Sequence, residues 1–136
     1  MYPRIEGTAQ ARLKVKVREE KPFSETSEGP RLTSGSSILV YEGDLEGEAV
    51  LEEVRVHFTD KRAGIYGVQR FAGRLKDLQG SFVLHLAGQV REGAQSSTLT
   101  VIPGSGTGGL KGLRGEMRLS TLPGEILFLV FHYHFA

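Results

Sequence analysis

The amino-acid sequence predicts an all-β protein, in which one domain of eight antiparallel strands closes into a barrel with little helix. Three observations favour this fold class. Apolar and polar residues alternate with a period of two along most of the chain, short turn-forming segments separate the alternating runs, and no run keeps a helical period for three turns. Because eight sequential strands leave two exposed edges unless the sheet closes, we expect a closed barrel.

The first expected strand shows the alternation most clearly. Over residues 8–18, apolar residues alternate with polar or charged ones, so the strand has one dry face and one wet face. Residues 21–37 are rich in Ser, Glu, Gly and Pro and show no period, which indicates a long loop. Seven more strands are expected at residues 38–41 (or from a few residues earlier), 48–59, 65–75, 81–91, 96–102, 115–122 and 126–135.

The connections between the later strands have the composition of hairpin turns. They are short and carry Asp, Gly or Pro, and they lie at residues 44–47, 60–64, 77–80, 92–93 and 123–124. Sequential antiparallel pairing is therefore the simplest topology. The only helical turn expected lies near residues 108–113, within a glycine-rich segment.

That glycine-rich segment, residues 103–116, also contains a GxGxxG pattern at Gly104, Gly106 and Gly109. In a dinucleotide-binding domain a helix would follow the glycines. Here Gly112 and Gly115 follow, each costing about 1 kcal/mol in a helix interior. No Gly-Lys-Ser or Gly-Lys-Thr closes a P-loop either. The glycines are therefore expected to allow close backbone approach at an end of the sheet.

Length and composition exclude several classes of protein. A chain of 136 residues is long enough for one core, so residues 1–136 are expected to form one domain. The net charge of +1 gives no basis for nucleic-acid or membrane-surface partners. With no cysteine there is no disulfide framework, thiol catalyst or cysteine-type zinc site, and no cofactor is expected. The absence of a leader-like or spanning apolar run predicts a soluble, cytoplasmic protein. The lack of Asn and the many Arg and Glu residues resemble a thermophile's composition.

The glycine-rich segment from Pro103 to Glu116 resembles the signature of a bacterial family of unknown function whose members adopt an allene oxide cyclase-like β-barrel. Two hairpin regions, residues 41–48 and 80–84, are similar to that family in the same order, and the resemblance covers residues 32–135. It implies a small barrel with a cavity. Where relatives place an acidic residue and then Arg on the fourth strand, this chain has Gln69 and Arg70, and where they place Gln-His on the fifth it has His85 and Leu86.

Other candidate site residues come from polar groups on an apolar strand face. On the third expected strand, Glu52 shares a face with Val50, Val54, Val56 and Phe58, and Glu48 has the same parity. A buried carboxyl group there would have a raised pKa and could act as an acid or base. The alternative is that Glu52 lies at a rim or pairs with Arg70 or Arg55. A shift of one residue in register would exchange the two faces.

Histidines supply the remaining candidates. His85 lies on the face opposite Phe82, Leu84 and Leu86, where it is either structural or a proton carrier. His132 and His134 lie on one side of the last strand at a spacing that could offer two imidazoles to a metal, but nothing in the sequence fixes further ligands. We therefore assign no metal.

The last expected strand predicts a partner, because residues 126–131 are apolar on both faces. Either the 21–37 loop or another subunit must cover the second face, and we expect a homo-oligomer.

Three functions are compatible with these patterns. The first, which we prefer, is binding of a small lipophilic molecule in the barrel cavity, with candidate lining residues Glu48, Glu52, Gln69, Arg70 and His85. The second, implied by the resemblance, is an isomerase or cyclase that uses Glu48 or Glu52 on a lipophilic substrate. The third is a structural barrel with a filled core. Only binding and catalysis require an open cavity.

Overall fold

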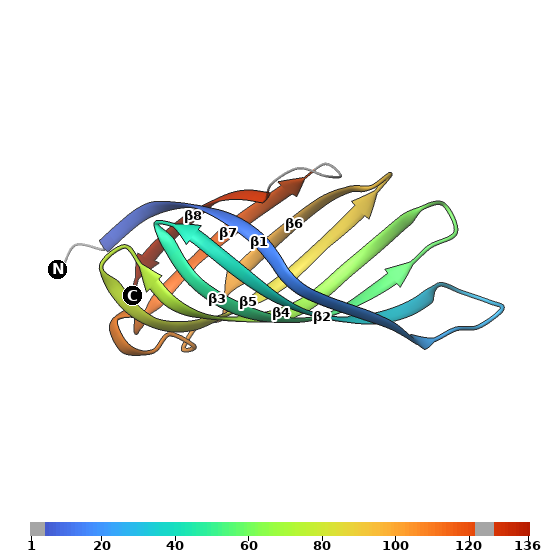
Figure 1. Cartoon of the computed structure of the whole chain (residues 1–136), viewed down its shortest axis with the longest axis horizontal. Coiled ribbons are helices and arrows are strands. Elements are labelled where there is room, and N and C mark those ends of the chain that lie inside the picture. The colour runs from blue at the N-terminus through green and yellow to red at the C-terminus, as the bar shows by residue number, and fades with distance from the viewer. Residues whose placement is uncertain (1–4, 122–126) are drawn as a thin grey trace.

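The computed structural model describes residues 5–121 and 127–136, which form a closed eight-stranded antiparallel barrel in sequential order (Figure 1). All the strands except β8 are longer than the sequence predicts. Their bounds are β1 Ile5–Ser24, β2 Arg31–Gly43, β3 Leu45–His57, β4 Arg62–Leu75, β5 Leu78–Arg91, β6 Ala94–Val101, β7 Leu113–Thr121 and β8 Leu127–Phe135. One 3-10 turn, η1 (Gly108–Leu110), lies within the glycine-rich segment where a helical turn was expected. The predicted turn at 123–124 lies outside the described residues.

Pairing of the first and last strands closes the sheet. Residues 5–13 of β1 run antiparallel to residues 127–135 of β8, so neither terminal strand leaves a free edge along this stretch. The β1–β2, β3–β4 and β5–β6 hairpins lie at one end of the barrel, and the β2–β3 and β4–β5 turns lie at the other. The tight turn between β5 and β6 has positive φ angles at both Glu92 and Gly93, as a two-residue hairpin favours.

A dense aromatic core fills the end of the barrel near the β2–β3 and β4–β5 turns. Tyr41, Phe71, Phe82 and Phe131 are almost wholly buried and form a continuous chain of ring contacts, with centroid separations of 5.3, 5.0 and 5.9 Å. Such pairs add about 0.5–1.5 kcal/mol each beyond their area burial. This half of the barrel has the packed interior expected of a structural barrel with a filled core.

The glycine-rich segment closes the same end. Thr107 N–H donates to the Ser81 carbonyl at 2.9 Å, and Leu110 in η1 is fully buried against the core. A Cβ on Gly106 would lie 2.0 Å from the Leu110 carbonyl oxygen, so only glycine allows this approach. The expected role of the glycines at a sheet end is therefore confirmed.

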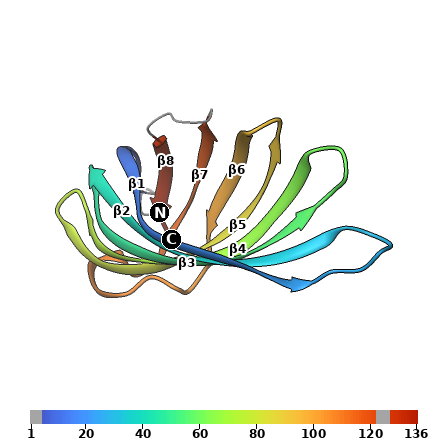
Figure 2. The ribbon, with the colours of Figure 1, turned by 45° about the vertical axis from the view of Figure 1, so that its right-hand side comes forward.

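The loop predicted at residues 21–37 is confined to residues 25–30, which corrects the sequence reading. Most of the segment belongs to β1 and β2, whose hairpin reaches well past the neighbouring strands (Figure 2). Its composition suggested a loop because the residues of β2 that face the interior here are small or polar: Thr33, Gly35 and Ser37 are all buried. Polar residues inside a barrel do not produce the hydrophobic alternation by which a strand is recognised.

A β-bulge in β1 changes which residues face the interior. Val15 pairs with Leu39 and Val17 with Ile38, so Lys16 is the extra residue. Before the bulge the odd-numbered residues face inward. After it Arg18 and Glu20 do so, whereas Val17 lies on the outer face and is 46% exposed.

Candidate functional site: an internal cavity with a charged mouth

The half of the barrel near the β1–β2 hairpin contains a cavity of about 110 Å³. The apolar part of its wall comes from Val15 and from one leucine on each of seven strands: Leu13, Leu39, Leu51, Leu86, Leu99, Leu119 and Leu127. The eighth strand, β4, contributes Gln69, which is 1% exposed. For comparison, an engineered cavity of about 150 Å³ holds benzene. The cavity therefore suits a compact apolar group of about that size or smaller.

Gln69 lies between the cavity and the aromatic core, because it lines the cavity and contacts Tyr41 of the core. The Tyr41 hydroxyl donates a hydrogen bond to Gln69 Oε1, and both side chains are buried. Burial raises the pKa of the Tyr41 hydroxyl well above its ordinary value. This hydroxyl therefore stays protonated and serves as a fixed donor.

Charged side chains gather at the mouth of the cavity, where Arg18, Glu53 and Arg55 all line it. The Glu53 carboxylate, 2% exposed, forms an ion pair with Arg18 Nη1 and has its Oε1 3.4 Å from Arg55 Nε. Arg18 Nη1 also donates to Ser37 Oγ at 3.0 Å, and Arg18 Nη2 lies 3.4 Å from Glu20 Oε2. The two arginines and two glutamates carry opposite charges in equal number, so the cluster is nearly neutral.

Beside this cluster, Thr33 joins Glu20 to His57. Thr33 Oγ1 lies 2.7 Å from Glu20 Oε1 and 2.8 Å from His57 Nε2, and it is 3% exposed. Its hydrogen bond is the largest cause of the lowered pKa of Glu20, and Arg55 and Arg18 lower that pKa further against the effect of partial burial. Since the Thr33 hydroxyl proton is given to Glu20, His57 acts as the donor to Thr33 Oγ1 in this arrangement.

Of the five candidate residues taken from the sequence, only Gln69 lies in the cavity. Glu48, Glu52, Arg70 and His85 all lie on the outer face of the barrel and are exposed. Glu48 lies 3.5 Å from Lys16 Nζ, and Glu52 accepts hydrogen bonds of 2.7 and 2.8 Å from Ser36 Oγ. Their assignment to the cavity is therefore wrong. The reason is register, because the odd-numbered residues of β3 face inward and the even-numbered residues, which include Glu48 and Glu52, face outward.

Sequence reasoning missed the charged residues of the mouth for two reasons. Glu53, Arg55 and His57 lie on the face of β3 opposite Glu52, and the candidates were taken from the Glu52 face. Arg18 and Glu20 are turned inward by the bulge at Lys16, for which the sequence gives no signal. Thr33 lay in the segment interpreted as a loop.

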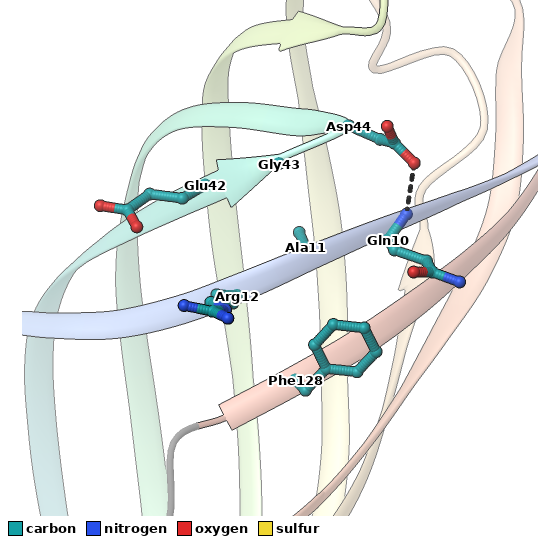
Figure 3. Close-up of a pocket in the computed structure, with 7 residues that line it drawn as sticks. All are labelled: Gln10, Ala11, Arg12, Glu42, Gly43, Asp44 and Phe128. Carbon is teal, nitrogen blue, oxygen red and sulfur yellow. Dashed lines mark hydrogen bonds between the residues drawn. The ribbon is translucent and has the colours of Figure 1, made fainter.

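The outer wall carries a shallow groove across β8, β1 and the end of β2 (Figure 3). Phe128 and Arg12 lie side by side on neighbouring strands, and Asp44 Oδ2 accepts a hydrogen bond of 3.0 Å from the Gln10 backbone N–H. This contact ties the β2–β3 turn to β1. The charged side chains here are exposed, unlike Glu53 in the cavity.

The expectations for the last strand have mixed outcomes. Phe128 is 51% exposed and Phe131 is buried, so both faces of β8 carry large apolar side chains, and the β1–β2 hairpin leaves Phe128 uncovered. The homo-oligomer stays a prediction.

His132 and His134 are on the outer-facing parity of β8, and among residues 5–121 and 127–136 no three His, Cys, Asp or Glu side chains group around a metal position. Within the same residues no helix is long and apolar enough to span a membrane.

The fold and its cavity define a class of protein, the small closed β-barrel with an internal pocket. The chain belongs to a family described as "protein of unknown function (DUF3224)", whose model matches residues 9–133. It is similar to the crystal structure of a DUF3224 protein of unknown function from Shewanella oneidensis MR-1. The two share 26% identity and a TM-score of 0.77 over 98% of this chain and 99% of the other. No curated protein matches the sequence. The family resemblance is confirmed, and the likeness to allene oxide cyclases stays an expectation.

Proposed function

We propose that this protein binds a small apolar molecule, or the apolar end of a larger one, in the barrel cavity. The supporting observation is the contrast between the two halves of the interior: four aromatic rings fill one, whereas seven leucines surround a cavity of about 110 Å³ in the other. Protein interiors contain few voids larger than a water molecule.

The size of the cavity restricts which lipophilic molecules could be the ligand expected from the sequence. A void of about 110 Å³ is too small for a long acyl chain, so the enclosed part of the ligand is a compact branched or ring-shaped group. Any remainder must extend through the charged mouth. The β1–β2 hairpin, which replaces the expected loop, forms one wall of that mouth through Arg18 and Ser37.

Geometry favours binding over the isomerase or cyclase alternative. That reaction was assigned to Glu48 or Glu52, and both lie outside the barrel. Glu53 is the carboxylate that lines the cavity, but its contacts with Arg18 and Arg55 explain it as a structural ion pair. Binding needs no group beyond those that surround the cavity.

The experiment is native mass spectrometry of the freshly purified protein, followed by denaturation and identification of any released molecule. Two variants on β5 sharpen it. Leu86→Phe adds a ring to the cavity wall, and His85→Phe adds the same ring to the outer face one residue away. The wild type and His85→Phe should retain a small molecule, or bind benzene when none is retained, and Leu86→Phe should do neither. Equal binding by both variants would contradict the proposal. The same spectra give the subunit number.

A further inference from the structure

We infer that the outer face of strands β2 to β5 is an interface with a second copy of this chain, related to the first by a two-fold axis. The proposed dimer is independent of the cavity and of any ligand in it. Its interface lies away from β8, the strand whose sequence predicted a partner. The relevant features are an apolar patch on the outer face, two opposite charges within it, and the arrangement of those charges.

Apolar side chains gather on this face although it is directed toward solvent. Val50 on β3 and Tyr66 and Val68 on β4 are 56%, 53% and 48% exposed. Half-buried aliphatic side chains continue the patch over β2, β3 and β5, namely Ile38, Val54 and Val83. The solvent-facing side of an antiparallel sheet is normally polar, and a contiguous apolar patch there marks a contact surface.

Glu52 and Arg70 bring opposite charges into this patch without pairing with each other. Glu52 lies on β3 opposite Val68, and Arg70 lies on β4 opposite Val50. These four residues form a square, with the valines on one diagonal and the charges on the other. Glu52 accepts hydrogen bonds from Ser36, and within residues 5–121 and 127–136 neither charge has an oppositely charged group within 4.0 Å.

A two-fold axis along the valine diagonal makes this square complementary to itself. In a two-fold interface, a residue that contacts a second residue of the other copy is repeated by the reverse contact. Val50 and Val68 would therefore each meet their own counterpart across the axis. Glu52 would meet the partner's Arg70, and Arg70 would meet the partner's Glu52. Both charges that lack an ion pair within one chain gain one in the dimer.

A second copy satisfies this patch better than an apolar occupant. A lipid surface or an apolar protein face would cover Glu52 and Arg70 without supplying either charge with a partner, which is unfavourable. A second copy supplies both partners at once. The same axis also brings together Val54, which follows Glu52 on the outer face of β3, and Val83, which lies opposite Arg70 on β5.

Two charge-reversal variants test the interface. Glu52→Arg gives the patch two positive charges and Arg70→Glu gives it two negative charges, so neither variant should associate with itself. Because each contact occurs twice in the dimer, each change should raise the dimer dissociation constant at least about a hundredfold. An equimolar mixture of the two variants restores both contacts and should form a heterodimer. Sedimentation equilibrium of the wild type, each variant and the mixture measures these constants.

Two lysine variants test the position of the interface. Val68 and Phe128 are similarly exposed, at 48% and 51%, and their strands lie on opposite sides of the closed barrel. Val68→Lys should dissociate the dimer, because it places two lysines at the axis, and Phe128→Lys should leave it intact. Circular dichroism in dilute solution, where the wild type is also monomeric, shows whether each variant folds. Should a charge-reversal variant not fold, the lysine variants decide the question.

Four results would overturn the proposed dimer. A wild type that stays monomeric at its highest soluble concentration, or that forms a trimer, would exclude a two-fold dimer. A dimer that survives Val68→Lys but not Phe128→Lys would place the interface at β8 instead. Failure of the mixed charge-reversal variants to associate would contradict the pairing of Glu52 with the partner's Arg70. None of these results bears on ligand binding in the cavity.

Discussion

Glu52 and Glu53 are neighbours in the chain, yet their carboxylates lie on opposite sides of the barrel wall. The Glu53 side chain is 2% exposed and forms an ion pair with Arg18, whereas Glu52 lies outside and accepts hydrogen bonds from Ser36. Two residues of identical chemistry thus differ only in the face of β3 that they occupy. This pair gives a direct comparison of the two environments.

Replacing each of these carboxylates with an amide should affect stability unequally. Glu53→Gln removes the charge that compensates two partly buried guanidinium groups, so the free energy of unfolding should fall by about 1–3 kcal/mol. Glu52→Gln should change it by no more than about 0.5 kcal/mol, because the site is on the surface. Urea unfolding followed by circular dichroism measures both. Equal effects would contradict the assignment of faces.

The buried hydrogen bond between Tyr41 and Gln69 should show strong coupling in a double-mutant cycle. Tyr41→Phe leaves Gln69 Oε1 buried without its donor and should cost about 1–3 kcal/mol. Gln69→Leu should cost a similar amount, because it leaves the Tyr41 hydroxyl without an acceptor. The double variant, which removes both polar groups, should cost less than the sum of the two single changes. Additive costs from denaturant unfolding would argue against the hydrogen bond.

Titration of tyrosine gives an independent test of the same site. Because burial raises the pKa of Tyr41, its hydroxyl should not ionise while the barrel remains folded. Alkaline difference spectra count the ionised tyrosines. Tyr41 should therefore add one phenolate to the count in the urea-unfolded chain and none to the count in the folded wild type. Tyr41→Phe should reduce the count only in the unfolded state. If folded Tyr41→Phe shows one phenolate fewer than the folded wild type, Tyr41 ionises in the fold and must lie near solvent.

Glu20 should make stability depend on pH in the acid range. Its pKa is lowered in the fold, from an ordinary value of 4.5, by the Thr33 hydrogen bond and then by Arg55 and Arg18. A lowered folded-state pKa stabilises the fold above the unfolded value, and that contribution is lost as the pH falls through the folded value. Thr33→Val should therefore destabilise the protein more at pH 7 than below the folded-state pKa. Unfolding curves across the acid range test this, and a difference that stays constant with pH would contradict it.

Two glycines in the same loop are needed for different reasons, Gly106 for close contact and Gly104 for its backbone conformation, so alanine at each should destabilise the protein to a different extent. Gly106→Ala would place a Cβ 2.0 Å from the Leu110 carbonyl oxygen and should cost about 3 kcal/mol or prevent folding. At Gly104 a Cβ meets nothing within 4 Å, but φ is +85°, so Gly104→Ala should cost only about 1 kcal/mol. Thermal unfolding of both variants measures the difference. A larger effect at Gly104 would be inconsistent with the close approach at Gly106.

Most of the fold could be predicted from the sequence, because turn residues and the two-residue period are local signals. The Glu92–Gly93 turn, the helical turn near Gly108 and the number and order of strands are all readable in this way. Much less of the candidate site could be predicted. Gln69 lines the cavity and was among the candidates, whereas Arg18 and Glu53 line it and were not, because the direction of a side chain depends on bulges and on which face of the sheet closes inward.

The sequence by itself determined that the chain is all-β. Its apolar and polar residues alternate along each strand, and short turn segments separate these strands. Only the tertiary structure decided which face became the interior. On β3 the face with Val50 and Val54 lies outside, while Glu53 and Arg55 lie inside, where Arg18 from another strand neutralises Glu53. A charge can be buried only when a partner meets it, and such partners, distant in sequence, come together only when the strands pair in register.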